Sequence, residues 1–325
     1  MVYKKVDRIK EEISVIGLGC WNFGGDWDNT MDQKSIDIVH KSIELGINFF
    51  DVAPVYGWGN SEIVLGKALK GKRDKVIIAS KAGLLWNDKH ETTNNLSKAS
   101  LLKEVDESLI RLGTDYIDIY QMHWPDPNTA LEDTAEGLRI LKASGKIRYI
   151  GISNFSKEDA LKMHDYVGVD CQQSLYNMFE RNTDSYHSIP LEYKTEDEIL
   201  PMVNKLGQAF LPYSPLFQGL LAGKFNKGIT FSKDDIRNAN PKLVGPDFKV
   251  YFDAALQLKE LADKYSKPMN EIALNWLVQK PEVTSIIGGA STVTQIEQNI
   301  HCTTWKIDDE MMKEIGMIIK PFETL

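Results

Sequence analysis

Short apolar runs alternate along the chain with longer stretches in which apolar residues recur at helical spacing. An apolar run bounded by glycine, proline or asparagine is typical of a buried strand, whereas helical spacing predicts an amphipathic helix. Eight strands are predicted, at residues 15–19, 48–51, 76–81, 116–123, 147–153, 169–174, 208–213 and 283–287. The predicted helices cover residues 32–45, 61–69, 97–112, 130–143, 156–166, 196–206, 248–265, 269–279 and 292–300, with a last one from about residue 308.

The order of these elements predicts an α/β fold. A helix follows each predicted strand and no hairpin turn joins two of the eight, so the strands are expected to be parallel. Their number, in a chain of 325 residues, favours a closed (β/α)8 TIM barrel over an open sheet. Residues 1–15 are expected to form a small hairpin lid, and extra helices are expected after the seventh strand and at the C-terminus. No linker or repeat divides the sequence, so residues 1–325 are expected to form a single domain.

Composition narrows the class of partner. The chain is 42% hydrophobic, which is typical of a globular protein with a large core. Its net charge of −8 argues against nucleic acid or an anionic membrane as the main partner. The sequence contains neither an apolar signal segment nor a run of about eighteen apolar residues, so the protein is expected to be cytoplasmic. Cys20, Cys171 and Cys302 lie far apart without metal-ligand spacing, which fits a reducing compartment and predicts no metal site.

Four residues with acid–base chemistry stand at the ends of three consecutive predicted strands. Asp51 ends the second strand and Tyr56 follows in its loop, while Lys81 ends the third strand and His123 the fourth. The active site of such a barrel lies at the C-terminal ends of its strands. Each residue alone has an ordinary explanation, such as a capping carboxylate, a solvent-facing lysine or a packed histidine. The four together predict one small site.

Physical chemistry assigns a role to each of these side chains. A phenol with a pKa near 10 is a poor acid at neutral pH, and a neighbouring ammonium is expected to lower that value. Asp51 is expected to hold Lys81 as an ion pair, and Tyr56 to donate a proton to a carbonyl oxygen or take one from an alcohol. His123 is expected to orient the same oxygen by a hydrogen bond. No side chain donates a hydride, so a nicotinamide cofactor is implied.

Glycine-rich stretches do not match the common nucleotide-binding motifs. Residues 17–22 begin like a dinucleotide fingerprint, but Asn22 stands where the third glycine belongs. Residues 57–60 also lack the pattern, and the sequence contains no Walker A motif. A Rossmann domain is therefore not expected.

Several motifs match those of one known family, in the same order and over nearly the whole chain. They are residues 46–57, 61–62, 65–66, 80–81, 118–125, 151–155, 213–216, 219–224 and 288–291, with Gln295 and Asn299. Through these motifs the chain resembles the aldo-keto reductases. The similarity is greatest to bacterial members of the general-stress and inositol-utilisation types, and it extends more distantly to potassium-channel β subunits.

The resemblance implies a (β/α)8 barrel that binds NAD(P)H in an extended pose. It also implies that Asp51, Tyr56, Lys81 and His123 are the catalytic tetrad, with Tyr56 as the general acid. By position, it further implies cofactor contacts at the nicotinamide, at the pyrophosphate and ribose, and at the adenosine. The first group is Ser153, Asn154, Gln173 and Tyr213, the second is Ser214, Leu216, Gly219, Lys224 and Arg237, and the third is Gly289, Ser291, Gln295 and Asn299. The implied cofactor contacts are completed by Trp21, Asp51 and Pro215.

One departure from the family pattern bears on the identity of the cofactor. Many relatives that prefer NADP carry Arg or Lys where this chain has Ser291 and Thr292. A 2′-phosphate prefers a cation, which Lys224 or Arg237 is then expected to supply. NADP(H) is the expected cofactor, with NAD(H) as the alternative.

Tryptophans gather at the same end of the predicted barrel. Five of the seven fall at or just after the ends of the first four predicted strands: Trp21, Trp27, Trp58, Trp86 and Trp124. This clustering predicts an aromatic rim that stacks on rings or on the apolar face of sugars. Residues 214–247 are long enough to fold over a bound cofactor as a latch. The expected substrate contacts are Trp21, Tyr56, Trp58, Trp86, His123 and Trp124.

The leading hypothesis is a reductase of aldehydes or ketones that acts on a small carbonyl substrate. A sugar or polyol dehydrogenase running in the oxidative direction is an alternative. A cofactor-sensing binding protein is another, which His123 disfavours because the channel subunits carry asparagine there. An isomerase or lyase of phosphorylated substrates would leave Asp51, Tyr56 and Lys81 unexplained. Both a monomer and a small homo-oligomer remain open.

Overall fold

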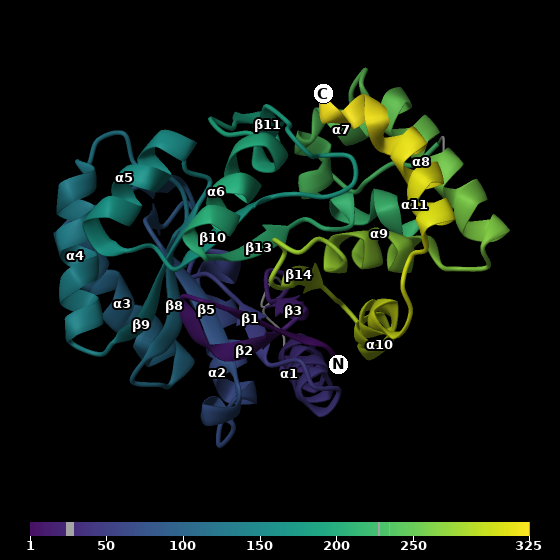
Figure 1. Ribbon diagram of the computed structural model, residues 1–325. Helices are drawn as coiled ribbons and strands as arrows, with labels where there is room; N and C mark the ends of the chain where they lie inside the picture. Colours follow the sequence, from purple (N-terminus) through teal and green to yellow (C-terminus); the bar gives the residue numbers. More distant parts are fainter. Residues whose placement is uncertain (24–28, 227, 234, 325) are drawn as a thin grey trace.

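Eight parallel strands form the centre of the molecule and confirm the predicted TIM barrel. In the computed structural model, which describes residues 1–23, 29–226, 228–233 and 235–324, the strand order is β13-β10-β9-β8-β5-β4-β3-β14. All neighbouring pairs in this sheet are parallel. The strands are β3 (Ile16–Gly19), β4 (Phe49–Asp51), β5 (Ile77–Ala82), β8 (Ile117–Met122), β9 (Ile147–Ser153), β10 (Cys171–Leu175), β13 (Ala209–Tyr213) and β14 (Ile286–Gly289) (Figure 1).

The two edge strands of the sheet meet just before β14. The backbone nitrogens of Thr284 and Ser285 donate to the Phe210 carbonyl oxygen at 2.9 and 3.4 Å. The Phe210 nitrogen in turn donates to Thr284 Oγ1 at 3.0 Å. These bonds satisfy backbone groups that an open edge would leave unpaired, so the sheet closes into a barrel.

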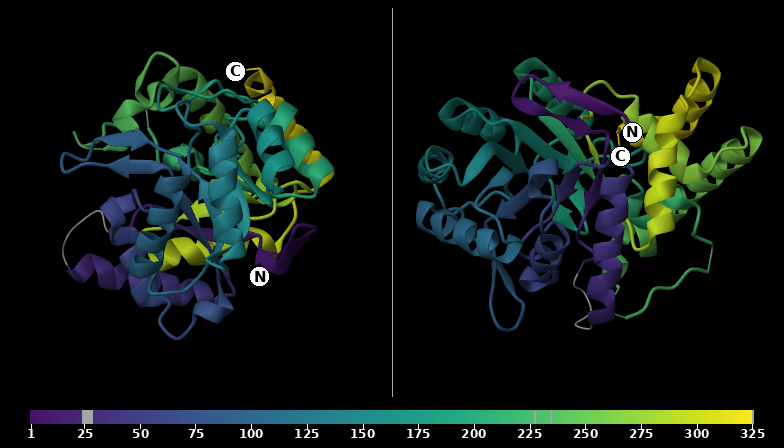
Figure 2. Two further views of the ribbon diagram at one scale, coloured as in Figure 1. Left: turned by 90° about the vertical axis from the view of Figure 1, so that its left-hand side faces the viewer. Right: turned by 90° about the horizontal axis from the view of Figure 1, so that it is seen from below.

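Helices surround the strands, as the views in Figure 2 show. Their ends follow capping chemistry: Ser97 Oγ accepts from the Ser100 nitrogen, and Ser156 Oγ accepts from the Asp159 nitrogen. Gly113 ends the first of these helices with a φ of 63°, a conformation that glycine adopts without strain. The barrel helices are α1 (Asn29–Glu44), α2 (Asn60–Ala68), α3 (Lys98–Leu112), α4 (Leu131–Ala143), α5 (Lys157–Val167), α6 (Leu200–Leu206), α9 (Met269–Val278) and α10 (Val293–His301).

The predicted N-terminal hairpin is present, and it covers the bottom of the barrel. Strands β1 (Tyr3–Val6) and β2 (Ile9–Ser14) pair antiparallel. Ile9 and Ile13 are buried in one cluster with Phe49 and other residues from the starts of the barrel strands. The hairpin therefore closes the N-terminal end, opposite the strand ends that carry the candidate site.

Additional elements decorate the barrel. The predicted extra helices are confirmed as α8 (Phe248–Lys264) after β13 and α11 (Asp309–Ile319) near the C-terminus (Figure 1). Between β5 and α3, in a stretch where the sequence pattern predicts neither strand nor helix, Leu84–Trp86 pairs with Thr92–Asn94 as the hairpin of β6 and β7. The remaining elements are β11 (Ser185–Tyr186), β12 (Ile189–Pro190), α7 (Pro241–Val244), η1 (Tyr56–Gly59), η2 (Arg73–Lys75), η3 (Thr195–Ile199), η4 (Phe217–Ala222), η5 (Ile236–Ala239), η6 (Cys302–Thr304) and η7 (Lys320–Glu323).

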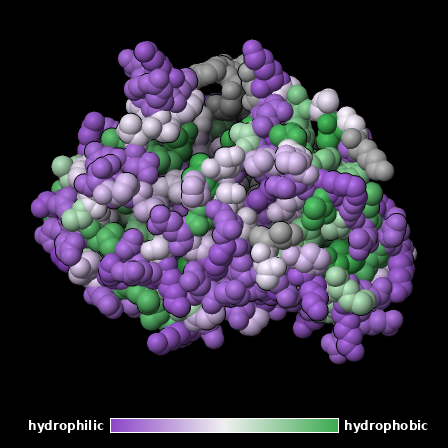
Figure 3. Space-filling model, turned by 90° about the horizontal axis from the view of Figure 1, so that it is seen from above, coloured by the Kyte–Doolittle hydropathy of each residue, from purple (hydrophilic) through white to green (hydrophobic). Residues whose placement is uncertain are grey.

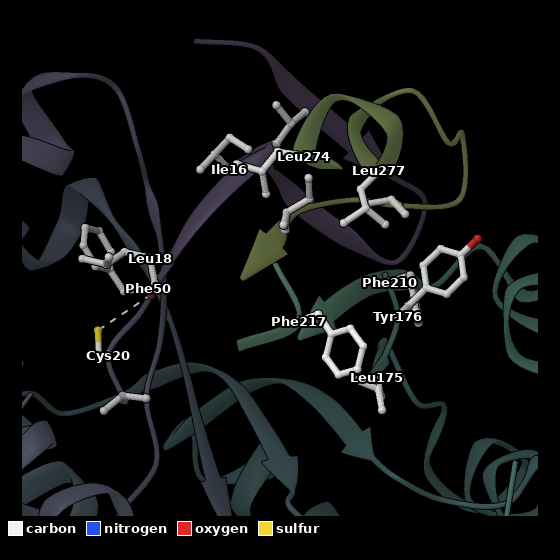
Figure 4. Packing of buried hydrophobic residues seen from close by; sticks show 14 of the residues in the cluster. Ile16, Leu18, Cys20, Phe50, Leu175, Tyr176, Phe210, Phe217, Leu274 and Leu277 are labelled. Carbon is white, nitrogen blue, oxygen red and sulfur yellow. Dashed lines mark hydrogen bonds between the residues drawn. The ribbon is translucent and has the colours of Figure 1, made fainter. Parts of the chain in front are cut away.

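The core fills the space between the strands and the helices. Figure 4 shows Ile16 of β3 near Leu274 and Leu277 of α9, and all three side chains are at most 1% exposed. Burial of this kind removes apolar area from water and is the main force that holds helices against the sheet. The face of the molecule in Figure 3 is mostly hydrophilic. Among the helices of the described ranges, none is long and apolar enough to cross a membrane.

Candidate active site

The residues predicted at the strand ends meet in one place. Asp51 is the last residue of β4, Lys81 lies near the end of β5, and Tyr56 begins η1. Lys81 Nζ donates to Asp51 Oδ1 at 2.6 Å, to the Tyr56 hydroxyl oxygen at 3.2 Å and to the Val52 carbonyl oxygen at 3.1 Å. The ammonium thus has three acceptors and joins the carboxylate to the phenol.

His123 completes this cluster from the neighbouring strand. It follows β8 directly, and its backbone nitrogen donates to the Ala82 carbonyl oxygen at 3.0 Å. Its ring meets that of Tyr56 edge to face, with 5.8 Å between centroids and an angle of 81°. Both rings line the same cavity, so the imidazole and the phenol can reach one ligand atom.

The expectation that Lys81 lowers the pKa of the Tyr56 phenol is only partly right. Burial raises the pKa of Tyr56 above its usual value, and Lys81 offsets only part of that rise. The prediction of a lowered pKa is therefore wrong in its net direction, because removing the phenolate from water outweighs the nearby cation. Tyr56 is consequently protonated at neutral pH, so its hydroxyl carries a proton that it can donate.

The charges of Lys81 and His123 follow from the same balance. Burial opposes the Lys81 ammonium, but Asp51 and Tyr56 outweigh that effect and raise its pKa. Burial, with Lys81 as a second cause, holds the pKa of His123 well below its usual value. At neutral pH the site therefore combines a charged lysine with a neutral imidazole, which offers a hydrogen bond without a second positive charge.

Two glutamine amides support Asp51 from inside the barrel. Asp51 Oδ2 accepts from Gln173 Nε2 at 2.8 Å and from Gln121 Nε2 at 3.2 Å. Gln173 Nε2 also donates to Gln121 Oε1 at 3.2 Å. Sequence reasoning missed Gln121. The sequence could have indicated Gln121, because it lies two residues before His123 in the predicted strand. Side chains two residues apart in a strand point to the same face.

A cavity of about 890 Å³ opens beside this cluster. It runs from Tyr56 and His123 to the end of β14, where Gly289 lies. Its lining includes every residue that was expected to contact the cofactor: Trp21, Asp51, Ser153, Asn154, Gln173, Tyr213, Ser214, Pro215, Leu216, Gly219, Lys224, Arg237, Gly289, Ser291, Gln295 and Asn299.

The expected substrate contacts divide into two groups. Trp21 and Trp124 line the cavity together with Tyr56 and His123. Trp58 and Trp86 are not among the described residues that line it, so their role as substrate contacts stays a prediction. Trp58 instead stacks on His90 with 4.2 Å between ring centroids and also lies 6.1 Å from the Trp86 ring. The β6–β7 hairpin brings these partners to Trp58, and Trp27 lies outside the described residues.

Sequence reasoning also missed part of the cavity lining. Tyr186 lines the cavity from the short β11–β12 hairpin, and its ring meets that of Tyr213 edge to face at 5.3 Å. Asn22 and Gln218 line it too. Their segments show no helix or strand period in the sequence, so only the fold brings them to the site.

The side-chain amide of Asn154, which was expected to contact the nicotinamide, already forms hydrogen bonds within the protein. Its Nδ2 donates to the His123 carbonyl oxygen and to Ser153 Oγ, each at 3.1 Å. Its Oδ1 accepts from the hydroxyls of Tyr193 and Tyr213, each at 2.9 Å. The amide therefore has its donors and acceptor already paired, and a ligand that bonds to it would have to replace one of these partners.

The two basic residues expected near the phosphates differ in their surroundings. Arg237 Nε donates to Asp235 Oδ1 at 2.9 Å, and the guanidinium also pairs with Asp235 Oδ2 at 2.5 Å. The same guanidinium lies 4.3 Å from the centroid of the Phe231 ring. Lys224 also lines the cavity. An arriving phosphate would therefore compete with Asp235 for Arg237.

The far end of the cavity retains binding capacity for a ligand. Asn299 lines it, and its buried Nδ2 has no hydrogen-bond partner within the described part of the chain. A buried amide donor without a partner is costly, so a ligand acceptor there would be favourable. With aromatic rings at one end, two cations along the path and this donor, the lining fits an extended dinucleotide. Within the ranges described, no group of three or more His, Cys, Asp or Glu residues could hold a metal ion.

Comparison with known proteins gives consistent matches over the length of the chain. Residues 15–320 match the model of the Aldo/keto reductase family. The chain is 38% identical over 324 residues to the aldo-keto reductase YhdN of Bacillus subtilis (strain 168), covering 98% of this chain and 94% of that protein. It is 32% identical over 328 residues to the NADH-specific methylglyoxal reductase of Escherichia coli (strain K12), covering 94% and 95%. The solved structure of glycerol dehydrogenase AKR11B4 from Gluconobacter oxydans matches with a TM-score of 0.88 at 33% identity, covering 98% and 95%.

Proposed function

The chain belongs to the aldo/keto reductase family of oxidoreductases, and on that premise we propose that it reduces small aldehydes or ketones to alcohols with NADPH. The observation that carries the proposal is the contact of Lys81 Nζ with both Asp51 Oδ1, at 2.6 Å, and the Tyr56 hydroxyl, at 3.2 Å. A phenol tied to an ion pair at the mouth of a cavity suits the transfer of one proton.

Each side chain has one role in the proposed reaction. When bound, the reduced nicotinamide supplies the hydride that no side chain can provide. Tyr56 donates its hydroxyl proton to the carbonyl oxygen of the substrate as negative charge develops there. Neutral His123 orients that oxygen by a hydrogen bond. Lys81 stabilises the phenolate that is left, and Asp51 holds Lys81 in place.

The cofactor is proposed to lie along the cavity from Tyr213 to Asn299. The Tyr213 ring would hold the nicotinamide ring by stacking, and the side chains of Ser153 and Gln173 would hold the carboxamide. Asn299 would donate to the adenine through its unpaired Nδ2. The pyrophosphate and ribose contacts are proposed for Ser214, Leu216, Gly219, Lys224 and Arg237.

A preference for NADP(H) is proposed to depend mainly on Lys224. Arg237 is already paired with Asp235, so Lys224 is the better candidate to meet a 2′-phosphate. Lys224→Gln should raise the Kd of NADPH about tenfold, since a charge-assisted bond is lost, and should leave the Kd of NADH nearly unchanged. Fluorescence titration with both nucleotides measures this, and equal losses for the two would contradict the assignment.

The proposed substrates are short polar carbonyl compounds. One relative is a methylglyoxal reductase and a structural neighbour is a glycerol dehydrogenase, both of which act on three-carbon compounds. Trp21 and Trp124 add apolar faces to the cavity beside Tyr56 and His123. The opposite reaction, oxidation of a polyol, is the second candidate, which the glycerol dehydrogenase favours. The protonated state of Tyr56 at neutral pH favours reduction.

Methylglyoxal with NADPH is the direct test of this function. Purified protein should consume NADPH, followed by the loss of its near-ultraviolet absorbance, and an aromatic aldehyde serves as a second substrate. Glycerol with NADP⁺ at alkaline pH tests the oxidative candidate in the same assay. Tight NADPH binding without turnover of any carbonyl or polyol in a broad panel would contradict both candidates and favour a cofactor-sensing protein.

A further inference from the structure

Tyr186 lines the cavity without a part in the proposed proton transfer. It belongs to β11, and its side chain reaches the cavity that Tyr56, His123 and Tyr213 also line. Its ring meets that of Tyr213 edge to face, with 5.3 Å between centroids. A charge on Tyr56 would raise the pKa of Tyr186, so the two phenols lie close enough to interact. Tyr186 therefore belongs to the catalytic end of the cavity.

The Tyr186 hydroxyl differs from those of two neighbouring tyrosines. Tyr193 and Tyr213 each donate to Asn154 Oδ1 at 2.9 Å, so their protons are already used. Burial raises the pKa of Tyr186 above its usual value, so this phenol keeps its proton at neutral pH. The Gln218 amide offsets part of that rise, as a donor beside the phenol oxygen does.

A backbone group fixes the orientation of Gln218. The backbone nitrogen of Lys242 can only donate, and it donates to Asn240 Oδ1 at 3.1 Å. Asn240 is therefore left with its Nδ2, which donates to Gln218 Oε1 at 3.0 Å. This bond leaves Gln218 Nε2 on the side of His187 and Tyr186. The amide consequently offers Tyr186 a donor, and the hydroxyl proton of Tyr186 remains for another acceptor.

We infer that Tyr186 is a specificity-determining residue, whose hydroxyl donates a hydrogen bond to a second oxygen of the substrate beside the reacting carbonyl. The site then prefers α-hydroxy and α-oxo aldehydes to alkyl aldehydes of the same length. The inference rests on the proposed function, because it assumes that the carbonyl oxygen lies at Tyr56 and His123. A substrate without the second oxygen would displace water from the Tyr186 hydroxyl without giving it an acceptor, which costs free energy.

The hairpin that carries Tyr186 is held by the segment after β13. Residues 187 and 188 form its two-residue turn with φ of 48° and 63°, a conformation that is costly for residues other than glycine. Lys242 of α7 holds the base of the hairpin. Its Nζ donates to the Ser185 carbonyl oxygen and to Glu180 Oε1, each at 2.8 Å. Tyr186 is thus fixed before a substrate arrives, which reduces the entropy lost on binding.

The test compares two substrates that differ by one hydroxyl group. Purified protein is assayed with NADPH and either 2-hydroxypropanal or propanal, and kcat/KM is measured for each from the loss of NADPH absorbance. The wild-type protein is expected to favour 2-hydroxypropanal at least about fivefold, because only this substrate offers Tyr186 an acceptor.

Tyr186→Phe removes the hydroxyl and keeps the ring that packs on Tyr213. The ratio of the two kcat/KM values is expected to fall about three- to tenfold, as the loss of one hydrogen bond predicts. The intrinsic reactivity of the two aldehydes cancels, because both proteins are compared on the same pair. Tyr251→Phe is the matched control and should keep the wild-type ratio. Tyr251 is a buried tyrosine of α8 that is not among the described residues lining the cavity.

The Kd of NADPH separates a substrate contact from a cofactor contact. In Tyr186→Phe it should stay close to the wild-type value while the ratio falls. An unchanged ratio in Tyr186→Phe overturns the role of Tyr186, whether or not the Kd of NADPH rises. Equal use of both aldehydes by the wild-type protein overturns it as well. If the wild-type protein reduces neither aldehyde nor any other carbonyl compound, the proposed function itself fails, and that result is distinct from the others.

Discussion

The two ends of the cavity differ in how completely the protein satisfies its own polar groups. At the catalytic end, Lys81 bonds to Asp51 and Tyr56, and two buried amides occupy the second oxygen of Asp51. At the far end, Asn299 Nδ2 is buried without a partner within the described residues. Along the path between the two ends, the guanidinium of Arg237 is paired with Asp235 of its own chain.

This difference separates the chemical part of the site from the binding part. A side chain that transfers a proton has to be held in the correct place before the substrate arrives, which its own hydrogen bonds achieve. A side chain that binds a ligand contributes most to the binding free energy when its hydrogen bond is made only with that ligand. Mutations at the catalytic end should therefore change turnover, whereas mutations at the binding end should change cofactor affinity.

Tyr56→Phe should have the largest effect on turnover. Loss of the proton donor should lower kcat about 10²- to 10⁴-fold, while the Kd of NADPH stays nearly unchanged because the ring remains. Steady-state kinetics with methylglyoxal and fluorescence titration with NADPH measure the two quantities. Tyr120→Phe is the control, since it removes a buried hydroxyl that has no partner among the described residues. Unchanged turnover in Tyr56→Phe would exclude this phenol as the donor.

Lys81→Met should damage both turnover and stability. The free energy of unfolding should fall by about 3–5 kcal/mol, because Asp51 is left as a buried charge without its partner. The phenol of Tyr56 also loses the cation that lowers its pKa. Turnover should therefore fall, and the pH optimum of turnover should move upward. Denaturant unfolding and kinetics measure these effects, with Lys103→Met on the surface as the control. A stable, active Lys81→Met protein would show that the ion pair is dispensable.

The pH dependence of reduction should reflect the raised pKa of Tyr56. The acid form of the phenol is the active form, and burial extends its range upward, so activity is lost only as pH rises beyond the usual tyrosine value of about 10. His123 stays neutral throughout, since its pKa is held well below its usual value. The profile of kcat/KM should therefore be flat from about pH 7 to 9. A falling limb near pH 7 would contradict this assignment of the phenol.

Asp235→Asn should have the smallest effect, and at the binding end only. Removal of the carboxylate frees Arg237 for a phosphate, so the Kd of NADPH should fall about two- to fivefold, as expected for a partly exposed ion pair. The kcat should change little if product release does not limit turnover. Asp253→Asn, which breaks the surface pair with Lys249, is the control. Weaker NADPH binding by Asp235→Asn would show that the pair supports the site instead of competing with the ligand.

The barrel and the catalytic cluster could be predicted because they depend on order along the chain. Parallel strands bring their ends to one edge, so residues at the ends of successive strands, such as Asp51, Lys81 and His123, must lie close together. The family motifs also predicted the cofactor contacts, and each of those residues lines the cavity.

What the sequence could not show depends on contacts between distant segments and on burial. Trp58 looked like a pocket residue, but His90 stacks on it, and the Trp86 ring lies tilted 6.1 Å away. Tyr186 reaches the cavity from a hairpin that carries no periodic pattern. The direction of the Tyr56 pKa shift depends on the balance between desolvation and one cation, and the degree of burial is set only by the folded structure.

The most direct test of the account follows a single hydrogen atom. NADPH that carries deuterium at both C4 positions is incubated with the protein and methylglyoxal, and the alcohol product is examined by mass spectrometry. The account predicts one carbon-bound deuterium in the product, with the hydroxyl proton supplied from water through Tyr56. A product without deuterium, or no product with any carbonyl substrate, would contradict the claim that this chain is an NADPH-dependent reductase.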